Sequence, residues 1–117
     1  HDFEEGAKIV TSSCAEGRIT ISLASIAKLY YDCSKSQNYK LSLFFSDDLI
    51  TPLASNLSLS KPSNNCELHT VGINFNKLLD SSYQGITKTF VVKIYESDGI
   101  TQVGSNIVFA AHTIISC

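Results

Sequence analysis

Residues 87–99 read TKTFVVKIYESDG and lead into residues 102–116, QVGSNIVFAAHTIIS, and these two runs decide the fold class. Both runs are rich in β-branched and aromatic residues, which favour strands over helices. Asp98-Gly99 lies between them, and an Asp-Gly pair flanked by strand-like runs is a strong hairpin signal. The stretch therefore predicts an antiparallel hairpin near the end of the chain.

The same alternation of polar and apolar residues extends upstream of this hairpin. Residues 18–23, RITISL, alternate cleanly, which predicts a strand with one buried face and one wet face. Pro52 lacks an amide proton, so the less regular segment around it is expected at a sheet edge. Strands are expected at residues 8–11, 18–23, 26–33, 39–46, 49–59, 67–75, 87–96 and 102–116, with a short helical turn at 76–82.

Residues 18–31 also carry a second periodicity. Ile19, Leu23, Ile26 and Tyr30 fall at helical spacing, and a helix here would make the fold α+β. The β-branched, Thr and Ser content of the segment favours strands instead. The prediction for this segment is strand, with helix as the alternative.

About seven short strands, separated by turn signals roughly every ten residues, fit an antiparallel β-sandwich of immunoglobulin-like type. The length of 117 residues fits a single domain spanning residues 1–117. The chain has no Trp, and its cysteine spacing does not match the bridge of antibody domains. The prediction is therefore an all-β, immunoglobulin-like sandwich by architecture, outside the antibody family.

Charge and hydropathy exclude two classes of partner. The formal net charge is −2 and Arg18 is the only arginine, whereas nucleic-acid binders need a basic stripe to neutralise phosphates. No apolar run approaches the roughly 18 to 20 residues that a membrane-spanning helix requires. We therefore expect neither nucleic-acid binding nor a membrane span in this chain.

Four cysteines in a short chain predict two disulfides. A zinc site is less favoured, because zinc ligands come in close pairs and the nearest pair here is Cys14 and Cys33. Three connectivities are possible for four cysteines. The order along the chain favours Cys14–Cys33 and Cys66–Cys117, since each pair could join neighbouring strands.

Three features indicate the compartment. The chain has no Met, so His1 is not a translation start, and the chain is expected to be a processed product that has lost its signal peptide or a cut fragment. Asn56-Leu57-Ser58 is an N-glycosylation sequon. Together with the predicted disulfides, these features indicate a glycoprotein that is secreted or resides in the lumen of the endoplasmic reticulum.

Catalytic and metal-binding chemistry is not expected. His69 and His112 lie in apolar strand patterns without ligand spacing, so both are expected to be partly buried, hydrogen-bonded side chains. The chain has no Gly-x-Ser-x-Gly elbow for a nucleophilic serine. Asp47-Asp48 is expected to form a turn, because adjacent acids on an extended chain project to opposite sides. We therefore expect no enzyme activity, no metal and no cofactor.

Aromatic residues supply the candidate binding surface. In the pairs Tyr30-Tyr31 and Phe44-Phe45, one ring of each pair must point outward from a strand. Tyr is enriched at interfaces, and an exposed apolar patch usually marks a partner site. We therefore predict a protein-binding surface at Tyr31, Phe44 and Tyr39. The alternatives are a small-lipid carrier with its ligand between the sheets, and a secreted, disulfide-stabilised effector or toxin.

The segment from Ser82 to Gly99, with Gly85, Phe90–Glu96 and Asp98-Gly99, resembles the late strand of the delta subunit of the translocon-associated protein. The layout of residues 19–33 and 41–48 is similar to an earlier pair of strands in that family. The resemblance implies an immunoglobulin-like, lumenal domain beside a protein-conducting channel. The closing strands also resemble lipid-recognition sandwiches of the mite-allergen type, which would fit the carrier alternative.

Overall fold

The computed structural model describes residues 3–30, 38–59 and 68–117. Within these ranges the regular structure is strand, apart from one turn of 3₁₀ helix, η1 (Ser81–Tyr83). The prediction of an all-β chain with antiparallel strands is confirmed. The expected helical turn is present but later, because β5 continues as a strand through Leu79.

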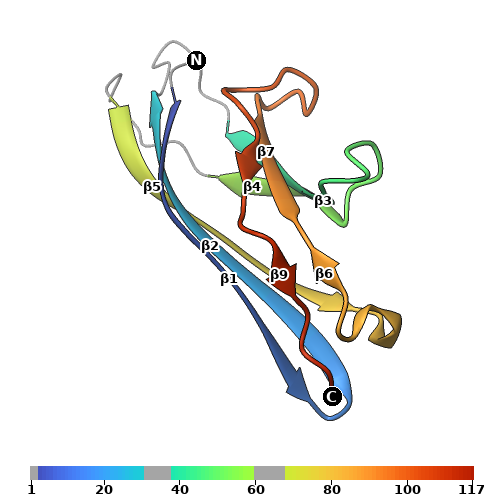
Figure 1. Cartoon of the computed structure of the whole chain (residues 1–117). Coiled ribbons are helices and arrows are strands. Elements are labelled where there is room, and N and C mark those ends of the chain that lie inside the picture. The colour runs from blue at the N-terminus through green and yellow to red at the C-terminus, as the bar shows by residue number, and fades with distance from the viewer. Residues whose placement is uncertain (1–2, 31–37, 60–67) are drawn as a thin grey trace.

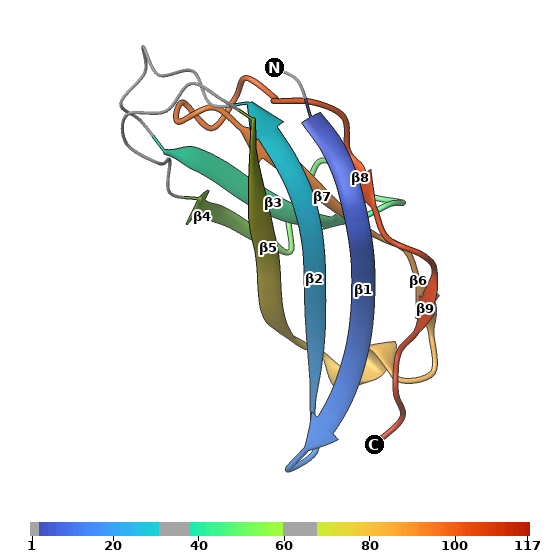
Figure 2. The same cartoon turned by 90° about the vertical axis from the view of Figure 1, so that its left-hand side faces the viewer.

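The first sheet has three long antiparallel strands in the order β1-β2-β5, which run side by side in Figure 2. Glu16 and Gly17 connect β1 to β2 with φ values of 55° and 73°. Two positive φ values in a two-residue loop are typical of a type I′ hairpin, and glycine tolerates such a value at low cost. The bounds are β1 (Phe3–Ala15), β2 (Arg18–Tyr30) and β5 (Leu68–Leu79).

The long β2 settles the ambiguity over residues 18–31. Residues 18–30 form one strand that pairs with β1 on one side and β5 on the other, so the helical alternative is wrong. The two strands predicted at 18–23 and 26–33 are joined into one. The helical spacing of Ile19, Leu23 and Ile26 is accidental, because in the strand Ile19 and Leu23 face the core and Ile26 faces the opposite side.

The second sheet has the order β4-β3-β7-β8 and is extended by the short pair β6-β9 (Figure 1). The predicted terminal hairpin is present, but the strand predicted at 102–116 is reduced to two short pieces, β8 and β9. Residues 103–106 are not strand, and of residues 109–111 Phe109 still donates its N–H to Phe90 O. The hairpin turn is closed by Glu96 N–H, which donates to Thr101 O at 2.8 Å, and Gly99 has a φ of 73°. The bounds are β3 (Tyr39–Phe45), β4 (Ala54–Leu59), β6 (Thr87–Lys88), β7 (Phe90–Tyr95), β8 (Ile107–Val108) and β9 (His112–Thr113).

One core cluster is shared by the inner sides of both sheets. Its members alternate with outward residues along each strand, as a period of two requires. The first sheet contributes Ile19, Ile21, Leu23, Ile73 and Phe75; the second sheet and its extension contribute Tyr39, Leu41, Leu43, Phe45, Phe90, Val92, Ile94, Val103, Ile107, Phe109 and Ile114.

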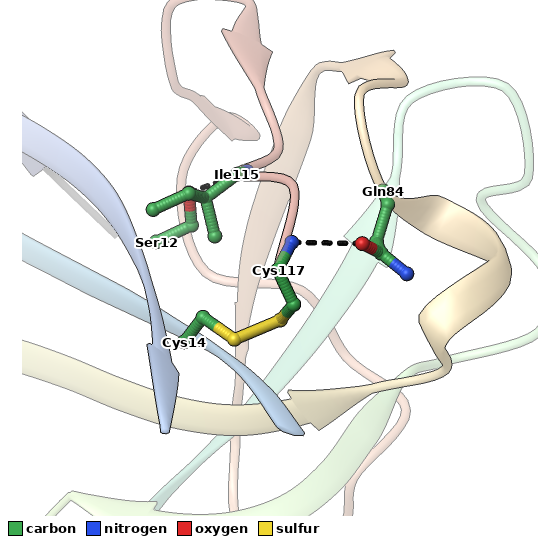
Figure 3. Close-up of a disulfide and its surroundings, with 5 residues drawn as sticks. All are labelled: Ser12, Cys14, Gln84, Ile115 and Cys117. Atoms are coloured by element: carbon green, nitrogen blue, oxygen red, sulfur yellow. Dashed lines mark hydrogen bonds between the residues drawn. A yellow bond between two sulfur atoms is a disulfide. The ribbon is translucent and has the colours of Figure 1, made fainter. Parts of the chain in front are cut away.

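The structure contains a disulfide between Cys14 and Cys117, with a Cα–Cα distance of 5.7 Å (Figure 3). The predicted pairings Cys14–Cys33 and Cys66–Cys117 are therefore wrong. The physical reason is that the end of the chain returns to β1, although 103 residues separate the two cysteines. Cys33 and Cys66 lie outside the described residues.

Candidate binding face

Two residues of the predicted aromatic surface, Tyr39 and Phe44, are buried. Tyr39 is 5% exposed and belongs to the core cluster, because it shares its side of β3 with Leu41 and Leu43. Phe44 is outside that cluster, as its position predicts, but it is only 4% exposed, and the Lys93 ammonium lies 5.0 Å from its ring centroid. Tyr31 lies outside the described residues. Neither described ring offers an accessible surface.

The first sheet presents a different surface, on the side away from the core. Leu23 and Phe75 face inward, so the alternate residues on the same strands face outward. We call this side of β1, β2 and β5 the outer face. Its described members are Ala7, Ile9, Thr11, Ser13 and Ala15; Arg18, Thr20, Ser22, Ala24 and Ile26; and Gly72, Asn74, Asn76 and Leu78.

Charge on the outer face lies toward its two ends. Arg18 lies at the hairpin end of the sheet, and the strand register pairs Lys28 with Glu4 on the same side, beyond Ile26. The stretch between them, residues 9–15 and 20–26, has no charged residue at outward positions. Depletion of charged side chains is the compositional feature that distinguishes the core of a protein interface from other surface.

A hollow of about 270 Å³ lies on the outer face. Ile9 and Ile26 line it and are 60% and 48% exposed. Small residues separate these two side chains, and a Cβ added to Gly72 would meet only the Asn74 amide nitrogen, at 3.6 Å. The full lining is Ala7, Ile9, Ala24, Ser25, Ile26, Gly72 and Asn74. The arrangement is a shallow apolar depression between two protruding isoleucines.

A β-bulge lies beside the hollow. The register between β1 and β2 shifts between Glu5 and Lys8, so that one strand carries an extra residue there. Such a bulge re-aims side chains and increases the local twist. Ala7 lies within the bulge and lines the hollow, so the bulge helps to shape this part of the outer face.

The other end of the outer face is polar but uncharged up to Arg18. The Ser22 hydroxyl donates to the side-chain amide oxygen of Asn76, Oδ1, at 2.7 Å across neighbouring strands. Leu78, 57% exposed, adds an apolar group to this end. The outer face therefore offers an aliphatic area at the hollow and an amide- and hydroxyl-rich area beyond it.

The remaining polar cluster fastens β1 to the end of the chain. The Ser12 hydroxyl accepts the Ile115 N–H at 3.0 Å (Figure 3). The same oxygen lies 2.8 Å from His112 Nε2. Since its oxygen accepts from Ile115, its own hydrogen is available to His112. The half-buried, hydrogen-bonded His112 confirms the prediction for that residue. With the adjacent disulfide, these contacts hold the terminal segment against β1.

Other predicted site residues take structural positions or carry no described side chain. Asp47 and Asp48 lie in a turn, as predicted: Asp47 pairs with Lys88 at 2.9 Å, and Asp48 accepts the backbone N–H groups of Ile50 and Thr51. Asn56 lies in β4, and its glycosylation remains a prediction. The His69 side chain is outside what the structure describes.

The described residues contain neither a membrane-spanning helix nor a metal-binding group of side chains. None of their helices is long and apolar enough to cross a membrane. Across the same residues, no group of three or more His, Cys, Asp and Glu side chains is placed to hold a metal ion. Comparisons of the chain with protein-family models, with curated proteins and with solved structures found no match.

Proposed function

We propose that this protein is a non-catalytic binding domain of the secretory pathway, secreted or lumenal, that acts through protein–protein contacts on its outer face. The observation that carries the proposal is the hollow with its uncharged lining, beside which two large apolar side chains, Ile9 and Ile26, are exposed. Exposed apolar groups that lie together, without charges between them, are typical of interaction sites.

The strand order supports an immunoglobulin-like sandwich as the scaffold. The order β1-β2-β5 corresponds to strands A, B and E, and β4-β3-β7-β8 to C′, C, F and G, of an immunoglobulin-type fold. In this scheme the outer face is the exposed side of the A-B-E sheet. The resemblance to the translocon-associated delta subunit fits the same architecture and implies a partner in the lumen of the endoplasmic reticulum.

A second disulfide, Cys33–Cys66, is part of the proposal. The β2–β5 ladder runs to the pair Tyr30 and Leu68. Cys33 follows Tyr30 by three residues and Cys66 precedes Leu68 by two, so the sequence places both just beyond the same end of neighbouring strands. With Cys14 bonded to Cys117, these are the two cysteines that remain. A non-reducing peptide map that yields Cys33 linked to Cys66 would support the pairing and the oxidising compartment.

Site-specific photo-crosslinking from the outer face tests the function. A benzophenone amino acid at Ile26, in the chain expressed in a eukaryotic secretory host, should yield a crosslinked partner that mass spectrometry identifies. The matched control is the same substitution at Ile50, which is 91% exposed in a loop of the second sheet. The partner should be crosslinked from Ile26 and not from Ile50, and Gly72→Val should abolish it by filling the hollow. Equal crosslinking from both positions would contradict the proposal.

A small-lipid carrier is the second candidate, and Ser25 is the observation that favours it. Its side chain is 4% exposed, and its hydroxyl has no hydrogen-bond partner in the described part of the chain. A buried hydroxyl without a partner costs roughly 1–3 kcal/mol, which the polar group of a bound lipid would relieve. Native mass spectrometry of the secreted chain distinguishes the candidates. A carrier retains a bound molecule of lipid-sized mass, and Ser25→Ala should lower the fraction of the chain that retains it.

A further inference from the structure

We infer that the free edge of β5 binds an extended segment of another protein, which adds to the first sheet as a further strand. The inference goes beyond the proposed function, because this site consists of backbone groups at the edge and not of the outward side chains. Addition of a strand to an open sheet edge is a recurrent mode of peptide recognition, in which main-chain hydrogen bonds supply the affinity.

β5 has a neighbouring strand on one side. That neighbour is β2, and Figure 2 shows β5 at the margin of the sheet. Constant-type immunoglobulin domains have a further strand, D, beside the strand that corresponds to β5. Among the described residues no strand occupies this position, and no backbone hydrogen bond joins residues 72–79 to a segment other than β2. The described part of the chain therefore leaves this edge open.

The β1–β2 hairpin determines which backbone groups of β5 face the open edge. Its two-residue turn makes Ala15 and Arg18 a hydrogen-bonded pair, and such pairs recur at every second residue of β2. The alternate residues of β2 bond to β5 instead, so Leu23 and its partner Phe75 form a hydrogen-bonded pair. The N–H and C=O groups that point to the open edge are those of Gly72, Asn74, Asn76 and Leu78.

The other edge strands have features that hinder the addition of a strand. β1 has a bulge between Glu5 and Lys8, and the end of the chain is fastened to it through Ser12. β4 pairs with β3 through a shifted register. β5 pairs with β2 over its whole length without a shift, and it contains no proline. A long, regular edge of this kind is a template for another strand.

The side chains beside the edge indicate the pattern of the added segment. Ile73 and Phe75 face the core and are 1% and 3% exposed, so apolar residues suit the positions opposite them. Asn74 and Asn76 are exposed on the other side of the sheet, and polar residues suit the positions opposite them. The occupant is therefore an extended segment in which apolar and polar residues alternate.

Lys77 adds a requirement for charge. It pairs with Ile21, so its side chain starts on the core side of the sheet, and it is half-buried. None of the described carboxylates forms an ion pair with its ammonium group. A lysine on an edge strand disfavours an apolar or basic neighbour. An Asp or Glu opposite Lys77 removes this obstacle, so the segment that binds carries an acidic residue there.

A capped peptide of sequence TETVTVTVT, antiparallel to β5 with its Glu opposite Lys77, is the probe. Amide hydrogen exchange of the full chain, followed by NMR, gives the first readout. In the free chain the amides of Gly72, Asn74 and Asn76 should exchange faster than those of Ile73 and Phe75, and the peptide should slow them at least tenfold. Equal protection of both sets in the free chain, or no peptide binding up to about 1 mM, would overturn the inference.

N-methylated peptides separate main-chain pairing from other binding. Methyl groups on the three threonine nitrogens opposite Gly72, Asn74 and Asn76 remove the donors that face β5, and they should raise the dissociation constant at least tenfold. The matched control carries the methyl groups on the three valine nitrogens, which face away from β5. It should bind within about twofold of the unmodified peptide. Equal losses from both peptides would contradict strand addition.

Two variants of the chain complete the test. Asn74→Pro removes an edge N–H that is not part of the β2 ladder, so the sheet should fold and peptide binding should be lost. Lys77→Glu should weaken binding of the Glu peptide and favour the same peptide with Lys in place of Glu, which also tests the site if Asn74→Pro does not fold. A Lys77→Glu chain that still prefers the Glu peptide would overturn the inference.

Discussion

Apolar residues on the outward sides of the two sheets differ in their exposure to solvent. On the second sheet, Phe44 and Val91 are paired across β3 and β7, and they are only 4% and 2% exposed. On the first sheet, Ile9 and Ile26 are 60% and 48% exposed. Large apolar groups thus occupy both sides; the second sheet buries Phe44 and Val91 and leaves Val108, which pairs with Val91, 46% exposed.

Lysine accounts for part of this difference. The Lys93 ammonium lies 5.0 Å from the centroid of the Phe44 ring, so a cation–π contact brings the long side chain over the ring. The residues that line the hollow of the first sheet include no lysine. A sheet that covers its apolar groups from within the chain has less need of a partner, and a sheet without such cover leaves that role to another molecule.

The largest effect is expected when the connection between the two regions is removed. The Cys14–Cys117 bond joins β1 of the first sheet to the segment that follows β9. Replacing both cysteines by Ala should lower the free energy of unfolding by about 3 kcal/mol, because the bond closes a long loop in the unfolded chain. Urea denaturation of the oxidised wild type and the double variant measures this loss.

The Ser12 contacts provide the control for that experiment. Ser12→Ala removes the hydrogen bonds to Ile115 and His112 but leaves the disulfide in place, and it should cost about 1 kcal/mol. An equal loss from Ser12→Ala and from the double cysteine variant would show that the side-chain contacts, and not the covalent link, fasten the chain end.

The next effect separates covered from uncovered apolar groups. Phe44→Ala should lower the free energy of unfolding by about 3 kcal/mol, because the ring is buried although it faces away from the core cluster. Ile26→Ala should cost less than about 1 kcal/mol, since nearly half of that side chain is already in water. Thermal unfolding of the two variants compares the two losses. Similar losses would contradict the distinction between the buried outward ring of the second sheet and the exposed side chain of the outer face.

The sequence predicted the strands well because their signal is local. The alternation in residues 18–23 and in residues 90–95 predicts which side of each strand is buried, and the core confirms it at Ile19, Ile21 and Ile94. The Asp98-Gly99 turn was also predicted. In the structure Gly99 has a positive φ and donates its N–H to Glu96 O. The disulfide was not predictable in this way, since it depends on which strands of two different sheets meet.

The predicted binding surface shows that the side of a strand on which a residue lies does not by itself determine its exposure. Tyr39 has the parity of Leu41 and Leu43, so its burial could have been read from the sequence. Phe44 does point away from the core cluster as predicted, but its coverage depends on Lys93, a residue 49 positions later in the chain. The outer face had a readable signal that was missed: residues 9–15 and 19–26 contain no charged residue at outward positions.

The smallest effect concerns the pH dependence of a loop that belongs to the second sheet. Asp48, in the β3–β4 loop, accepts the N–H groups of Thr51 and Ile50, and these backbone hydrogen bonds lower the pKa of its carboxyl below the ordinary 3.8. Because the folded-state pKa is lowered, the stabilisation is present above pH 3.8 and is lost as the pH falls through the folded-state pKa. Carbon-detected NMR titration of the Asp48 carboxyl should therefore give a midpoint below 3.8, and Thr51→Pro, which removes both the N–H and the hydroxyl donor of Thr51, should raise it.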